Sequence, residues 1–186
     1  LMDLQGKLGI IREENMKLLF EKNTIETSYK EELINDLLHI DELKPFLKPG
    51  LICISELIEN IYSHAGDSLT VPVKWSLELV IEDNTLRFVV RDLGIGIANS
   101  IRSKSTDSTM TTSEAVKLAI NGRFNNGRGM GLLSIKKQVV QGSIESFSIE
   151  CEESICLVTK QGEIFESTMT KKTGTTVSIS IVKKEF

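Results

Sequence analysis

The sequence is poor in residues that bind transition metals or form disulfides. Its 186 residues include only two histidines, His39 and His64, and three cysteines, Cys53, Cys151 and Cys156. An odd number of cysteines without a CxxC pair supports neither a zinc site nor a disulfide framework. Free cysteines are typical of a reducing compartment, so we expect a cytoplasmic protein.

The sequence also lacks an excess of positive charge and any long apolar run. It carries 26 acidic and 22 basic residues, a net charge of −4. A nucleic-acid surface needs a clustered basic excess, so we expect no contact with nucleic acid. No apolar stretch approaches the roughly 18 residues of a membrane span, and no signal peptide opens the chain, so we expect no membrane segment. The first residue is Leu1 rather than Met, which favours a fragment of a longer protein.

What is present is the composition of an ordinary globular domain. Hydrophobic residues make up 40% of the chain, enough for one sizeable core. We assign residues 1–48 to an N-terminal helical appendage or linker and residues 49–186 to the main domain. Residues 1–27 fit a helix or two short strands, and a clearer helical spacing follows at Leu33, Leu37 and Ile40. The boundary is set where prolines interrupt this pattern, at Pro45 and Pro49.

The main domain begins with a helix and a hairpin. Residues 51–65 have the spacing of an amphipathic helix, and residues 75–92 alternate as two antiparallel strands around Glu82-Asp83-Asn84. Residues 97–126 are a long connection, in which nine of the fourteen residues from Ser100 to Ser113 are Ser or Thr. A capping box predicts one short helix within it, with Thr111 and Glu114 as its members.

A second helix over residues 130–141 and three or four strands over residues 143–183 complete the chain. This order of elements predicts an α/β fold in a two-layer α+β arrangement. We expect one mixed, mainly antiparallel sheet with helices packed on one face.

Glu56 and Asn60 are the first candidate functional residues. They are four residues apart, so they project from one stripe of the helix beside its apolar face, and His64 continues this stripe one turn later. A carboxylate and an amide there suit the activation of a water and the binding of Mg²⁺, which prefers oxygen ligands. A solvated polar face is the alternative.

Asp92 ends the hairpin and is followed by Gly94 and Gly96. A carboxylate at the end of a buried strand can accept a hydrogen bond from a purine amino group. The glycines allow the backbone to approach a flat ring, because they have no Cβ. A glycine-rich turn capped by an aspartate is the alternative.

A third group of residues opens the helix over 130–141, in the run Gly127-Arg128-Gly129-Met130-Gly131-Leu132. Backbone N–H groups at a helix N-terminus form an anion site. The Gly-Lys-Ser/Thr ending of a Walker loop is absent, and no GxGxxG occurs in the chain. A glycine-rich hinge is the alternative. Further along, Thr175 stands where the chain enters its last strand, which by itself indicates only a turn.

In this order, ELIENIYSH, DLGIGI, GRGMGL and GTTVSISI resemble the GHKL ATPase superfamily over about residues 51–182. The superfamily includes gyrase-type topoisomerases, ATP-binding heat-shock chaperones, histidine kinases and MutL-like repair proteins. The resemblance implies ATP and Mg²⁺ as cofactors and an ATP lid at about residues 97–126. Four basic residues give the lid a positive charge suited to a triphosphate, so we expect ATP to order it: Arg102, Lys104, Arg123 and Arg128.

The resemblance also implies residue roles. Glu56 is similar to the family's general base, Asn60 to its Mg²⁺ ligand and Asp92 to the residue that binds the adenine amino group, with Thr175 in support. The remaining positions would contact the nucleotide: Gly94 and Gly96 beside the base, and Gly127, Arg128, Gly129, Gly131 and Leu132 at the phosphate end of the lid. His64 would lie near the phosphates, although capping or packing explains it equally well.

Two classes of function stay open. One is a small regulator resembling anti-sigma-factor kinases, which hydrolyses ATP or transfers its γ-phosphate to a protein partner. The other is a nucleotide-binding module of a larger sensor kinase or ATP-gated clamp, with slow or no hydrolysis. His39 is disfavoured as a phosphoacceptor, because Ile40 follows it where that motif has an acidic residue. We expect a protein partner or flanking domains, and a dimer is left open.

Overall fold

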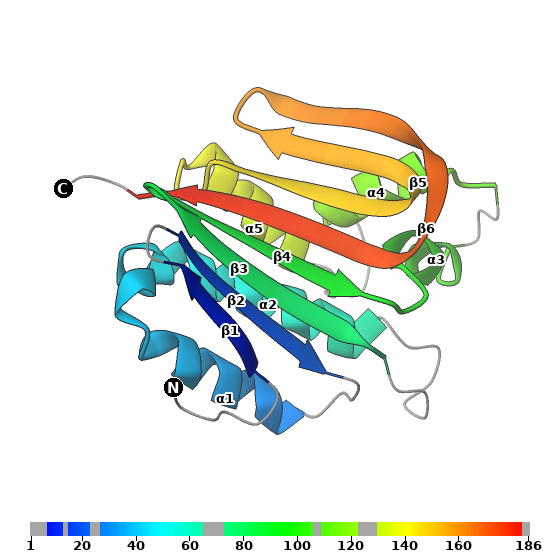
Figure 1. Cartoon of the computed structure of the whole chain (residues 1–186). Helices are drawn as coiled ribbons and strands as arrows, with labels where there is room; N and C mark the ends of the chain where they lie inside the picture. The colour runs from blue at the N-terminus through cyan, green and yellow to red at the C-terminus, as the bar shows by residue number, and fades with distance from the viewer. Residues whose placement is uncertain are drawn as a thin grey trace.

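The computed structural model describes residues 7–12, 15–22, 27–64, 73–105, 109–122 and 130–183. Over these ranges a six-stranded sheet, in the order β1-β2-β3-β4-β6-β5, is covered on one face by helices (Figure 1). Every pairing between the described strands is antiparallel. The prediction of a two-layer fold with a mainly antiparallel sheet is therefore confirmed, and the described strands include no parallel pair.

The N-terminal segment forms one edge of the sheet. β1 (Lys7–Arg12) and β2 (Asn15–Lys22) make a hairpin, and β2 pairs with β3 (Trp75–Glu82). Next come α1 (Thr27–Leu38) and the 3-10 helix η1 (Asp41–Phe46). Buried side chains of this segment join the common core: Phe20, Tyr29, Leu33, Leu37, Leu43 and Phe46. The helical description of residues 1–48 is therefore wrong for the two strands, because sheet pairing decided an ambiguous local pattern.

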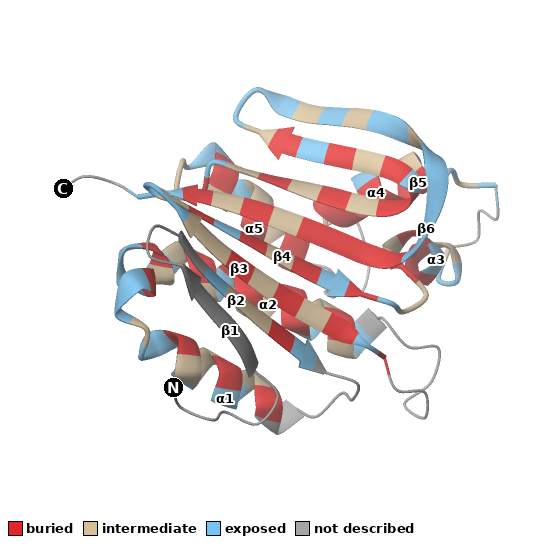
Figure 2. Cartoon of the chain, viewed as in Figure 1, coloured by how far each residue is buried: buried red, intermediate tan, exposed pale blue. Residues whose placement is uncertain are grey.

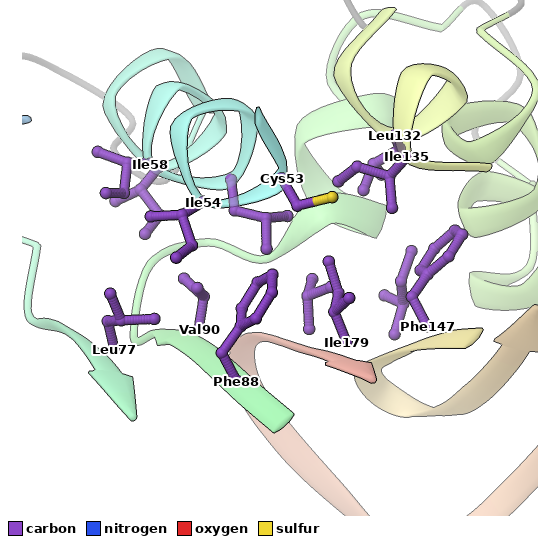
Figure 3. Packing of buried hydrophobic residues seen from close by; sticks show 14 of the residues in the cluster. Cys53, Ile54, Ile58, Leu77, Phe88, Val90, Leu132, Ile135, Phe147 and Ile179 are labelled. Atoms are coloured by element: carbon purple, nitrogen blue, oxygen red, sulfur yellow. The ribbon is translucent and has the colours of Figure 1, made fainter. Parts of the chain in front are cut away.

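The helix α2 (Leu47–His64) begins ahead of the predicted start at residue 51. Pro49 lies in its first turn, where a backbone N–H has no partner within the helix, so the proline does not interrupt it. The apolar side chains of α2 pack onto the sheet. Figure 3 shows Cys53, Ile54 and Ile58 of this helix above strand residues that include Leu77, Phe88, Val90 and Ile179.

The central hairpin of β3 and β4 (Thr85–Asp92) is confirmed. Alternate residues of both strands face the helices and are buried, as the banding in Figure 2 shows. The predicted second helix is also confirmed as α5 (Met130–Val140). Its residues Leu132 and Ile135 lie beside Cys53 over the sheet in Figure 3.

The long connection holds two helices in its described part. α4 (Thr112–Ile120) begins at the predicted capping box, in which Thr111 and Glu114 each accept a hydrogen bond from the other's backbone N–H. α3 (Ile97–Arg102) is not predicted by the sequence, because a helix of six residues gives too short a periodic pattern. None of the helices in the described ranges has the length and apolar character needed to cross a bilayer.

The C-terminal region forms two long strands, β5 (Ser146–Thr159) and β6 (Gly162–Val182), and not three or four separate ones. The pair Glu152-Glu153 lies at an irregularity within β5, where the pairing register shifts and Glu152 has a φ of 50°. In Figure 1 the β5–β6 hairpin bends back on itself. Its outer part, residues 154–167 beyond the irregularity, lies above the remaining strands in this view.

The core role of α1 provides a test with adjacent residues. Leu37 is fully buried, whereas Leu38 is 42% exposed. Leu37→Ala should lower the free energy of unfolding by about 2–5 kcal/mol, because it leaves a cavity, and Leu38→Ala should change it by less than about 1 kcal/mol. Urea unfolding followed by circular dichroism measures both. Equal small losses would mean that α1 is not part of the cooperative core.

Candidate functional site

Asp92 and Thr175 are brought together by the pairing of β4 with β6. They are direct cross-strand partners, although 83 positions separate them in the sequence. Both are buried, with exposures of 8%. The carboxylate of Asp92 accepts a hydrogen bond from the Gly94 N–H at 2.9 Å, and Thr175 Oγ1 accepts one from the Ile97 N–H at 3.0 Å. The predicted residues Asp92, Gly94 and Thr175 thus form one cluster.

Burial dominates the electrostatics of Asp92. Loss of solvation raises its pKa from 3.8 to about 6, and hydrogen bonds from Gly94 and from the backbone and hydroxyl of Thr175 partly oppose this rise. A buried carboxylate with remaining acceptor capacity binds a donor group more strongly than an exposed one, because water competes less. The site is therefore suited to a ligand that presents an N–H group.

Two glycines allow the chain to approach itself at this cluster. Gly174 has a φ of +75°, and a Cβ there would lie 1.9 Å from the carbonyl oxygen of Asp92. Gly96 has a φ of +80°, and its Cβ would lie 3.1 Å from the carbonyl oxygen of Gly174 and 3.3 Å from Cys151 Sγ. The sequence predicts Gly96 as a site residue but not Gly174. The available signal was the position of Gly174 directly before Thr175, where a residue without a Cβ allows the close approach to Asp92.

Glu56 and Asn60 meet the first turn of α5. A Cβ on Gly131 would lie 2.7 Å from Glu56 Oε2 and 3.3 Å from Asn60 Nδ2. The absence of a side chain at Gly131 therefore lets a carboxylate and an amide of α2 lie against the N-terminal turn of another helix. Both residues are only partly buried. This arrangement joins the first and third groups of predicted residues.

Several predicted site residues have no described geometry. Gly127, Arg128 and Gly129 lie outside the described residues, as does Arg123 of the lid. His64 is the last residue of α2, and its side chain is likewise outside the described part. Leu132 is 5% exposed and packs in the core.

Arg102 forms an ion pair with Glu152 inside the chain. It was predicted to add positive charge for a triphosphate, but its guanidinium contacts both carboxylate oxygens of Glu152 at 3.1 Å. It also donates to Thr112 Oγ1 at 2.9 Å and to the carbonyl oxygen of Met110 at 3.0 Å. Sequence reasoning missed Glu152, because nothing in the local sequence around a glutamate indicates a partner 50 positions away.

The described residues offer few donors for a metal ion. Within those ranges no three His, Cys, Asp or Glu side chains are grouped as a metal site. Mg²⁺ requires only oxygen ligands and retains several waters, so the amide oxygen of Asn60 together with phosphate oxygens is chemically sufficient. Asn60 lies against the N-terminal turn of α5, where a Cβ on Gly131 would come within 3.3 Å of its amide group.

The buried Asp92 predicts a pH dependence of stability. Its pKa is about 6 in the folded chain and 3.8 in the reference state, so the folded state binds more protons between these values. The contribution of Asp92 to the free energy of unfolding should therefore fall by up to about 3 kcal/mol as pH rises from 4 to above 6. Asp92→Asn removes this contribution. Urea unfolding should show the variant gaining stability relative to the wild type across this window, and a constant difference would contradict the assignment.

Comparison with known proteins identifies the family. A search of curated proteins found no match to the chain. The family model described as histidine kinase-, DNA gyrase B-, and HSP90-like ATPase matches residues 51–185. This range contains Glu56 and Asn60 of α2, the turn after Asp92, the whole of α5, and Thr175 within β6. The chain therefore belongs to this family, and its residues 51–185 form a GHKL-type ATP-binding domain.

Proposed function

We propose that this protein binds ATP with Mg²⁺ and hydrolyses it or transfers its γ-phosphate to a protein partner, and so acts as a regulatory switch. The observation that carries the proposal is the contact geometry at Gly131. It brings a carboxylate and an amide from α2 to the N-terminal turn of α5, where backbone N–H groups attract phosphate. Family membership supports ATP as the ligand.

In this proposal the cluster at Asp92 binds adenine, and the cluster at Gly131 binds the phosphates. Asp92 accepts the amino group of adenine, and Thr175 holds the carboxylate and the adjacent turn in place. Gly94 and Gly96 leave room for the base. Three residues of the described chain act at the phosphate end: Glu56, Asn60 and Gly131.

Glu56 is the residue suited to proton transfer. Its carboxylate lies next to the α5 N-terminus and can orient a water or a substrate hydroxyl toward the γ-phosphate. Asn60 supplies an amide oxygen as a metal ligand. When bound there, Mg²⁺ would neutralise charge on the phosphate oxygens. Transfer to a water gives an ATPase, and transfer to a hydroxyl of another protein gives a kinase.

The adenine assignment is tested by Asp92→Asn. Loss of a charge-assisted hydrogen bond should weaken the binding of a non-hydrolysable ATP analogue about 10- to 150-fold. Calorimetric titration measures the affinity. Asp83→Asn is the matched control, because Asp83 lies in the exposed β3–β4 turn, and it should bind like the wild type. Unchanged affinity in Asp92→Asn would remove this residue from the base site.

The catalytic assignment is tested by Glu56→Gln. Removal of a positioned base should lower turnover by about 10²–10⁴ while changing nucleotide affinity only a few-fold. Glu59→Gln is the control on the same helix, because Glu59 is exposed and pairs with Lys30 at 3.0 Å. Phosphate release and transfer to candidate partner proteins are the two readouts. Nucleotide binding without either activity in the wild type would identify a binding module of a larger sensor or clamp.

A further inference from the structure

The side chain of Arg102 joins three separate parts of the chain. It extends from α3 to the carboxylate of Glu152 in β5, to Thr112 at the start of α4 and to the backbone of Met110. It also donates to Asn99 Oδ1 at 2.9 Å within its own helix. All donor nitrogens of the guanidinium are used, and the side chain is only 25% exposed. One guanidinium nitrogen contacts both carboxylate oxygens of the largely buried Glu152, so this pair is more ordered than a surface ion pair.

Glu152 is held for this contact by the irregularity in β5. Its φ of 50° interrupts the regular alternation of the strand, and its side chain is 7% exposed. Thr112 donates to its carboxylate at 2.6 Å. Burial opposes ionisation, but the hydrogen bonds from Thr112 and Arg102 outweigh it and lower the pKa of Glu152. The carboxylate is therefore charged at neutral pH, as the pair with Arg102 requires.

The same part of the hairpin holds α4 at two further points. Ser113 and Ser154 share a hydrogen bond of 3.0 Å at the start of the helix. At its end, Lys136 of α5 contacts both Asn121 and Glu163, at 2.7 and 2.5 Å. The outer part of β5 and β6 is thus a platform for α4. These contacts hold α3 and α4, the described helices of the lid segment, against the sheet.

The helix α3 connects this platform to the base site. Its first N–H group, on Ile97, donates to Thr175, and its N-cap Gly96 packs against Gly174. A helix of six residues has little stability of its own, so contacts at its two ends set its position. At one end the contact is Thr175, and at the other it is the guanidinium of Arg102.

We propose that the Arg102–Glu152 pair positions α3, and through it Gly96 and Ile97, for adenine binding at Asp92 and Thr175. Neither Arg102 nor Glu152 touches the nucleotide in this arrangement, so both are positioning residues. The inference rests on the proposed function, because it assigns a support to the same base site. It also gives the long β5–β6 hairpin a role, because the irregularity in β5 places Glu152 in contact with Arg102.

The test compares the nucleotide affinity of Arg102→Gln, Glu152→Gln and the double variant. Urea unfolding first establishes that each variant is folded. Each single change should weaken the binding of ADP and of a non-hydrolysable ATP analogue by the same factor, about tenfold. The reason is that both nucleotides place their adenine in the same site. The double variant should be no weaker than the weaker single variant, since both changes break one pair. Arg102→Lys keeps the charge without the fork and should lose less affinity than Arg102→Gln. Glu150→Gln, whose partner is Lys172, is the control and should bind like the wild type.

Hydrogen exchange supplies a readout that does not depend on nucleotide. The amides of residues 97–102 should exchange faster in the single variants, whereas those of β3 should not change. If the wild type binds nucleotide and all variants bind it with the same affinity, the inference is overturned and the proposed function stays intact. An additive loss in the double variant, or a loss confined to the ATP analogue, would also overturn it. No nucleotide binding by the wild type would overturn the proposed function and the inference together.

Discussion

The structure depends on the burial of one face of the sheet beneath α2 and α5. Strand side chains alternate between the two faces, so every second residue of β4 enters the core. Leu86, Phe88 and Val90 satisfy this requirement with apolar groups, and Asp92 is the next residue in the same row. The rule that builds the core therefore also buries a carboxylate at the end of the strand. Its raised pKa follows from that position.

A similar constraint acts at the phosphate end. α2 and α5 lie side by side over the sheet, and Gln138 of α5 contacts Cys53 of α2. Once the two helices are packed, the residue of α5 that faces Glu56 and Asn60 must be small. Gly131 meets this requirement, and a methyl group there would approach the Glu56 carboxylate to 2.7 Å. The close packing of the two helices and the approach of α5 to the polar side chains of α2 thus have one common cause.

The length of the β5–β6 hairpin determines how much of the lid is held. Cys156 and Val158 in its outer part are buried, and Glu152, Ser154 and Glu163 bind polar groups of α3, α4 and α5. A shorter hairpin would lack these side chains. In the described part of the lid, α3 and α4 are consequently anchored to the sheet, so any movement of these two helices must break these contacts.

The sequence by itself determined the elements whose information is local. The α2 stripe, the β3–β4 hairpin, the capping box of α4 and the helix α5 were all predicted, because each depends on periodicity or on residues a few positions apart. The order of the four short motifs was enough to indicate the family. Tertiary structure alone decided that β1 and β2 extend the sheet and that Glu152 belongs within a strand. It also decided that Arg102 binds Glu152, 50 positions away. These outcomes depend on which segments become neighbours, and a pairing energy between distant residues leaves no local pattern in a single sequence.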